Sequence, residues 1–97
     1  GPFARLMKFK SEDEAIELAN MPCGALTAAV WTNDINRALR LSKRIKAGIV
    51  NINGHTHGAE FQFPFGGTGF SGNGAKEVGL QSLDEYSFSK LTTILYS

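Results

Sequence analysis

The sequence predicts an α/β fold: a parallel β-α-β-α-β sheet unit, then a long loop rich in glycine and phenylalanine, and a C-terminal strand. Strand-like apolar segments alternate with amphipathic segments over residues 4–53, and the connections between them are short. After Asn53 the periodic pattern stops and glycines become frequent. A chain of 97 residues forms one small domain with a limited core.

The first strand is expected at "ARLMKF" (residues 4–9), directly before a helix at "EDEAIELAN" (residues 12–20). Ser11 and Glu14 have the S-x-x-E spacing of a capping box, which satisfies free amides at a helix start. Pro22 ends the helix, since proline disfavours helix in the preceding residue. The buried face of this helix is expected to hold Ala15, Ile16 and Ala19.

A second strand and helix follow. "GALTAAVW" (residues 24–31) has no charge, as expected of a strand that is buried on both faces of a parallel sheet. The helix in "TNDINRALRLSKRIKAG" has an N-cap at Thr32, Asn33 or Asp34, and Gly48 is expected as its C-cap. Its buried stripe is predicted to comprise Ile35, Ala38, Leu39 and Ile45. Its basic residues are expected on a solvated outer face: Arg37, Arg40, Lys43, Arg44 and Lys46.

The rest of the chain is expected to hold a third strand, "GIVNIN" (residues 48–53), and then a structured loop over residues 54–79. A short helix is predicted within residues 80–86 and a terminal strand over residues 90–97, where β-branched residues are frequent.

The stretch "GGTGFSG" contains G-x-G-x-x-G from Gly67 to Gly72, the spacing of a dinucleotide-binding turn. That motif needs a strand before its first glycine and a helix at its last. Pro64 interrupts any strand before Gly67, and glycines divide the residues after Gly72. We therefore interpret the glycines as structural, because they permit positive φ in consecutive tight turns.

Other candidate sites have a structural interpretation. His55, His57 and Glu60 are of the types that bind zinc, but no second cluster accompanies them, so we expect no metal site. Cys23 lacks an identifiable base, so we predict a buried or half-buried structural thiol. Four phenylalanines predict either an aromatic pocket for an apolar substrate or a plug that closes the loop onto its own core: Phe61, Phe63, Phe65 and Phe70.

Composition excludes several classes of partner. The net charge of +1 gives no field that attracts nucleic acid, and no apolar run reaches the roughly 18 residues that a membrane span needs. A single cysteine cannot form an internal disulfide, so the expected location is the cytoplasm.

Together these segments resemble the C-terminal end of an aldehyde dehydrogenase. The resemblance covers nearly the whole chain, through "FKSEDEAIELAN", "GALTAAVWTNDINRALRLSKRIKAGIVNIN", "PFGG", "SGNG" and the terminal strand. It implies an enzyme that uses NAD or NADP to oxidise a small-molecule aldehyde to a carboxylic acid, through a cysteine thiohemiacetal, hydride transfer and thioester hydrolysis. The sequence departs from many relatives at Gly69, Ala75 and Lys76.

The resemblance also implies what this chain contributes. The family's nucleophilic cysteine, its glutamate and its cofactor domain precede this region, so we expect no catalytic and no cofactor-binding residue here and no activity from the chain alone. Cys23 does not match the nucleophile. Residues 1–86 would be the end of the catalytic domain and residues 87–97 an oligomerisation strand of a homo-oligomer.

The loop over residues 54–65 resembles one that lies over the family's substrate entrance. Substrate-binding residues are then expected at His57, Phe61, Phe63 and Phe65, of which Phe65 matches a tunnel-lining position. The alternative is a non-enzymatic module in which the β-α-β-α-β unit and an exposed sheet edge drive self-association.

Overall fold

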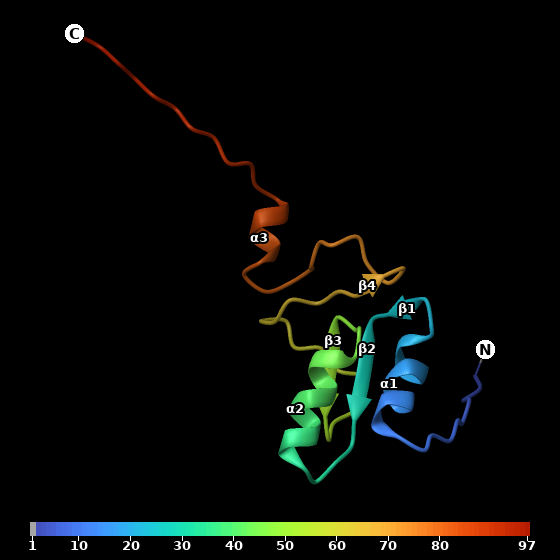
Figure 1. Ribbon diagram of the computed structural model, residues 1–97. Coiled ribbons are helices and arrows are strands. Elements are labelled where there is room, and N and C mark those ends of the chain that lie inside the picture. The colour runs from blue at the N-terminus through green and yellow to red at the C-terminus, as the bar shows by residue number, and fades with distance from the viewer. Residues whose placement is uncertain (1) are drawn as a thin grey trace.

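The computed structural model describes residues 2–97 and has an α/β fold with two small sheets. In chain order the elements are α1 (Glu12–Asn20), β1 (Gly24–Ala25), β2 (Thr27–Val30), α2 (Ile35–Arg44), β3 (Ile49–Ile52), β4 (Thr68–Gly69) and α3 (Ser82–Glu85). Strands β2 and β3 are parallel, with Thr27 opposite Ile49 and Val30 opposite Ile52. Strands β1 and β4 are antiparallel. Helices α1 and α2 lie on either side of β2 in Figure 1.

The β-α-β-α-β unit is incomplete, because the described residues before α1 contain no strand. The terminal strand predicted over residues 90–97 is also absent, and residues 87–97 extend away from the body of the molecule (Figure 1). This extension gives the molecule a long dimension of 74 Å against 35 and 23 Å for the other two. Both strand predictions are therefore wrong for this chain: a strand needs a partner for its N–H and C=O groups, and within residues 2–97 neither segment pairs with a sheet edge.

Helix α1 has the predicted bounds, and its N-terminus has a capping arrangement. The hydroxyl of Ser11 accepts a hydrogen bond of 3.2 Å from the Glu14 N–H. The Glu14 carboxylate accepts one of 2.7 Å from the Lys10 N–H, one residue before the amide that a capping box would use. Ile16 is the buried residue of this helix.

Helix α2 begins after Asp34, the third of the three predicted caps. The Asp34 carboxylate accepts hydrogen bonds from the N–H groups of Asn36 and Arg37, at 2.9 and 3.1 Å. The prediction that Gly48 caps the other end is wrong, because the helix ends at Arg44 and Ile45 is already extended. Gly48 instead lies before β3, where its N–H donates to the carbonyl of Ala25.

The buried core among the described residues consists of Ile16, Val30 and Ala38. The predicted apolar stripe of α2 is only partly covered: Ala38 is buried and Ile45 half-buried, whereas Ile35 and Leu39 are 67% and 54% exposed. The prediction that residues 24–31 are buried on both faces is also wrong, since Val30 is the buried residue of β2. A sheet of two strands is too narrow to cover the whole apolar face of a helix.

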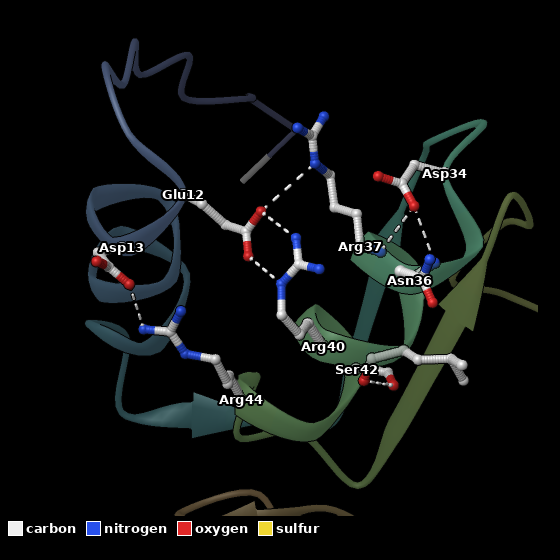
Figure 2. Close-up of polar contacts among 9 residues, drawn as sticks. Glu12, Asp13, Asp34, Asn36, Arg37, Arg40, Ser42 and Arg44 are labelled. Atoms are coloured by element: carbon white, nitrogen blue, oxygen red, sulfur yellow. Dashed lines mark hydrogen bonds and ion pairs between the residues drawn. The ribbon is translucent and has the colours of Figure 1, made fainter.

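Ion pairs join α1 to α2 (Figure 2). Arg40 donates two hydrogen bonds to the Glu12 carboxylate, at 3.0 and 3.1 Å, and Arg37 lies 3.4 Å from the same group. Arg44 is 2.7 Å from Asp13. The five basic residues are exposed as predicted, and three of them also pair with acids of α1. Because the groups are partly exposed, these pairs orient the helices more than they stabilise them.

Acid is expected to lower the stability of this helix pair. Hydrogen bonds from Arg40 lower the pKa of Glu12 below its usual 4.5, and the N–H of Arg37 lowers the pKa of Asp34 below its usual 3.8. A carboxyl whose pKa is lower in the folded state stabilises the fold above the unfolded value and loses this effect as the pH falls through the folded value.

We therefore expect the thermal midpoint to fall as the pH drops below about 4.5, and to fall less steeply in Glu12→Gln. Circular dichroism melts at several pH values and at low ionic strength measure it, since salt screens exposed pairs. Equal slopes for the two proteins would show that Glu12 is not involved.

Candidate functional site

A hollow of about 380 Å³ lies against the β2–β3 sheet, under the loop that follows β3. Thr27 of β2 and Ile49 and Asn51 of β3 share one face of the sheet and line it, because alternate residues of a strand point the same way. Leu26 and Phe65 add apolar surface. The loop supplies its outer wall: Thr56, His57, Gly58 and Ala59.

The hollow does not lie where open parallel sheets usually bind ligands, beyond the carboxyl ends of their strands. The loop instead folds back along β3, so that residues 56–59 face Ile49 and Asn51 within the strand. The candidate site therefore lies on a face of the sheet rather than at its end.

A second hollow, of about 410 Å³, adjoins the first and shares Ile49, Asn51 and Phe65 with it. It is also lined by Phe63 and by the exposed Glu60. The structure thus brings His57 and Phe65 together in one hollow and Phe63 and Phe65 together in the next. Phe61 lies apart from these: it is 81% exposed and lines neither hollow.

Backbone pairing holds Phe65 in place. Its N–H donates to the Glu77 carbonyl at 2.8 Å, and the Glu77 N–H donates back at 2.8 Å, which forms an isolated antiparallel bridge. Nearby, the Gly79 N–H donates to the carbonyl of Phe61 at 2.9 Å. The long loop is therefore tied to the segment before α3, and the backbone of Phe65 is held at a fixed position.

The glycine turn "GGTGFSG" is packed against itself and against β1. A Cβ atom on Gly72 would lie 2.4 Å from the carbonyl oxygen of Gly67, and one on Gly67 would lie 2.5 Å from the Cβ of Ser71. The Ser71 hydroxyl accepts a hydrogen bond of 2.8 Å from Ala25 N–H, and the Lys76 ammonium donates to the Gly67 carbonyl. These contacts give the glycines a structural role in the described residues, where no helix begins at Gly72 as the dinucleotide motif would require.

The histidines form an aromatic stack with Trp31. The rings of Trp31 and His55 meet edge-on with centroids 5.9 Å apart, and the rings of His55 and His57 stack at 5.1 Å. Within residues 2–97, no group of three or more His, Cys, Asp or Glu side chains lies close enough together to hold a metal ion. The imidazoles thus contact aromatic rings, and His57 faces the hollow.

Asn53 ties together the ends of β2 and β3. Its side-chain oxygen accepts a hydrogen bond of 2.8 Å from Thr32 N–H, and its amide nitrogen donates to the Thr32 carbonyl at 2.9 Å. Its own N–H donates to the Val30 carbonyl at 2.8 Å. The φ of Asn53 is +52°, a left-handed conformation in which asparagine is enriched. This residue turns the chain out of β3 into the loop that carries His55 and His57.

Sequence reasoning missed several residues of the site. Asn51 interrupts an apolar strand, and a polar residue in such a run is a signal that one face of the strand meets something polar. Thr27 is likewise a polar residue within an apolar run, "GALTAAVW". The roles of Asn53 and Trp31 depend on contacts between distant segments, for which the sequence holds no signal of comparable strength.

Cys23 is exposed, so the prediction of a buried or half-buried thiol is wrong. It follows the end of α1 in an exposed turn, where its carbonyl accepts a hydrogen bond from the Phe70 N–H. No helix in the described part of the chain is long and apolar enough to cross a membrane.

Comparison with known proteins gives one family throughout. The model of the "Aldehyde dehydrogenase family" matches residues 1–92. Retinal dehydrogenase 2 of Gallus gallus is 48% identical over 94 residues, which cover 97% of this chain and 18% of that protein. The chain therefore spans about a fifth of the length of the curated relatives that it matches.

Solved structures agree with this. A salicylaldehyde dehydrogenase from Pseudomonas putida, complexed with salicylaldehyde, superposes with a TM-score of 0.74 at 44% identity, over 79% of this chain and 16% of that one. A betaine aldehyde dehydrogenase from Staphylococcus aureus, in complex with NAD+, superposes with a TM-score of 0.75 at 42% identity, over 80% of this chain and 15% of that one. On the family match and these similarities, the chain belongs to the aldehyde dehydrogenase family.

Proposed function

We propose that this chain forms one wall of the aldehyde site in an NAD(P)-dependent aldehyde dehydrogenase, which oxidises an aldehyde to a carboxylic acid. The observation that carries the proposal is the hollow between the β2–β3 sheet and the following loop, which combines the phenyl ring of Phe65 with the imidazole of His57. Concave sites with apolar walls and a few polar groups are typical of small-molecule binding.

The contributions of the loop residues differ in this proposal. Phe65 supplies apolar contact in both hollows, and Phe63 extends the apolar surface of the second. His57 supplies a hydrogen-bonding group. Phe61 was expected to bind substrate but lines neither hollow. Only its carbonyl has a role here, because it accepts a hydrogen bond from the Gly79 N–H and so anchors the loop.

We assign the reaction chemistry to residues outside this chain. Oxidation of an aldehyde by this family's route needs a thiolate nucleophile, a base and a nicotinamide cofactor. Cys23, at the turn between α1 and β1, lines neither hollow, and the glycine turn lacks the preceding strand and following helix of a dinucleotide motif. Whether the cofactor is NAD or NADP depends on the part of the enzyme that binds it.

The proposal extends to subunit contacts through residues 87–97. Phe88, Leu91 and Leu95 in this segment are at least 91% exposed, and an extended apolar segment with free N–H and C=O groups can pair with the edge of another sheet. We propose that it contacts a second subunit of a homo-oligomer. A cytoplasmic location is part of the same proposal, since an exposed free thiol such as Cys23 persists in a reducing compartment.

The experiment that tests the function is an absorbance assay of aldehyde-dependent NAD(P)H formation. We expect the full-length enzyme to be active and the 97-residue chain to be inactive at equal concentration. Activity of the chain alone would overturn the assignment of the chemistry to other residues. If the full-length protein reduces no cofactor with any aldehyde but self-associates through residues 87–97, the self-association module is the better account.

A further inference from the structure

Two of the six asparagines in the chain are followed by glycine, Asn53 and Asn73. Asparagine is thermolabile because the backbone nitrogen of the next residue can attack its side-chain amide. A glycine in that next position has no side chain to hinder the attack. Both asparagines are exposed, so exposure does not distinguish them. The hydrogen bonds of their side chains do.

The side chain of Asn53 is held against a different segment of the chain. Its oxygen accepts a hydrogen bond of 2.8 Å from Thr32 N–H, and its amide nitrogen donates to the Thr32 carbonyl at 2.9 Å. This pair of hydrogen bonds forms the Asn53 clamp. Attack by the nitrogen of Gly54 requires the amide to turn toward Gly54, and that movement breaks both bonds. The fold therefore protects Asn53.

The side chain of Asn73 stays beside its own backbone. Its oxygen accepts a hydrogen bond of 3.0 Å from Ala75 N–H, so the amide spans Gly74, the residue that would attack it. A Cβ atom on Gly74 would meet nothing within 4 Å beyond its chain neighbours, which leaves open space for the reaction. Within residues 2–97 the amide nitrogen of Asn73, which is the leaving group, donates no hydrogen bond. No distant segment has to move.

From these contacts we infer that Asn73 is a modification site, at which the side-chain amide is lost spontaneously and an acidic residue replaces it. The Gly74 nitrogen bonds to Cγ of Asn73, the bond from Cγ to the amide nitrogen breaks, and ammonia leaves with the proton of the Gly74 N–H. Water opens the resulting succinimide ring at the side-chain carbonyl to give aspartate, or at the backbone carbonyl to give isoaspartate. One water enters, one ammonia leaves, and nothing is oxidised or reduced.

The product lies in a turn that is closely packed. On one side of Asn73, the Ser71 hydroxyl accepts a hydrogen bond of 2.8 Å from Ala25 N–H. On the other side, the Lys76 ammonium donates to the Gly67 carbonyl at 2.8 Å. Isoaspartate lengthens the main chain between these two contacts by one carbon, and a packed structure has little space for the addition. We therefore expect the modification to loosen the turn and to destabilise the fold.

The test follows both asparagines in the full-length protein during incubation at neutral and alkaline pH. Trypsin cleaves after Lys46 and Lys76, so one peptide, residues 47–76, contains both sites. Fragmentation in a mass spectrometer then locates the replacement of NH2 by OH. In the folded protein we expect Asn73 to convert about tenfold faster than Asn53, the factor that opening the clamp imposes. The rate at Asn73 should rise with pH, since the attacking nitrogen loses a proton.

Unfolding and a matched variant provide the controls. In concentrated urea the clamp is lost, and the two rates should become similar. Asn73→Ser keeps a hydroxyl that can accept from Ala75 N–H but has no amide to lose. During incubation the thermal midpoint of the unchanged protein should fall as isoaspartate accumulates, whereas that of Asn73→Ser should stay constant. A protein isoaspartate methyltransferase, used as a reagent, measures the isoaspartate.

Three results would overturn the inference. The first is conversion of Asn53 as fast as Asn73 in the folded protein, and the second is no conversion of Asn73 until urea is added. The third is a difference of the same size in urea, because the sequence and not the fold would then cause it. A thermal midpoint that stays constant while isoaspartate accumulates would contradict the effect on the turn. The assay needs no aldehyde or cofactor, so its outcome is independent of the function proposed above.

Discussion

Gly48→Ala is expected to lower the free energy of unfolding by about 3 kcal/mol or more, because the new methyl group has no space. A Cβ atom at Gly48 would lie 1.8 Å from the carbonyl oxygen of Gly66 and 2.9 Å from the Cα of Gly67. Both neighbours are backbone atoms, so no side-chain rotation relieves the contact. The segment that would have to move carries Phe65 and leads into β4.

Thermal unfolding of the full-length protein measures this effect, and Gly54→Ala is the matched control. The nearest atom to a Cβ at Gly54 is 3.7 Å away, which is ordinary van der Waals contact. We expect the control to unfold close to the unchanged protein and Gly48→Ala to unfold at a clearly lower temperature. Similar midpoints for Gly48→Ala and the control would mean that the approach of these two segments is not required for the fold.

Asn53→Ala is expected to cost about 2 kcal/mol, as the sum of two losses. The variant removes both side-chain hydrogen bonds to Thr32, and it places alanine at a φ of +52°, a left-handed conformation that asparagine tolerates better than alanine. The loop that carries His57 starts at this residue. We therefore expect weaker aldehyde binding in the full-length enzyme as well as lower stability.

Asn53→Gly separates the two losses, since glycine adopts positive φ without strain but makes no side-chain hydrogen bond. Denaturant unfolding should place the glycine variant between the unchanged protein and Asn53→Ala. If the glycine variant is at least as destabilised as the alanine variant, backbone strain contributes nothing, and if both match the unchanged protein, the clamp is irrelevant to stability.

Local signals in the sequence predicted the local elements of the fold. The cap at Ser11 and the proline at Pro22 are properties of short segments, and α1 has the predicted bounds. The parallel pairing of β2 and β3 follows from two apolar runs joined by a helix. Strands at residues 4–9 and 90–97 could not be decided in this way, because strand formation depends on a partner edge that lies elsewhere.

The candidate site was predictable only in part, for the same reason. The density of phenylalanines marked the loop, and the structure places Phe63 and Phe65 in adjoining hollows. Three features of the site depend on contacts between segments that are distant along the chain. They are the return of the loop over Asn51, the clamp of Asn53 on Thr32 and the stack of rings that begins at Trp31. Local patterns hold no information on such contacts until the fold has been determined.

The kinetics of Phe65→Ala in the full-length enzyme test whether the hollow at Phe65 is part of the aldehyde site. Phe70→Ala is the control, because Phe70 is also in the glycine-rich loop but is 89% exposed and lines neither hollow. We predict that Phe65→Ala raises KM for the aldehyde about tenfold with little change in kcat, as expected when contacts made equally with substrate and transition state are lost. An unchanged KM in Phe65→Ala, or an equal rise in Phe70→Ala, would show that the hollow is not part of the aldehyde site.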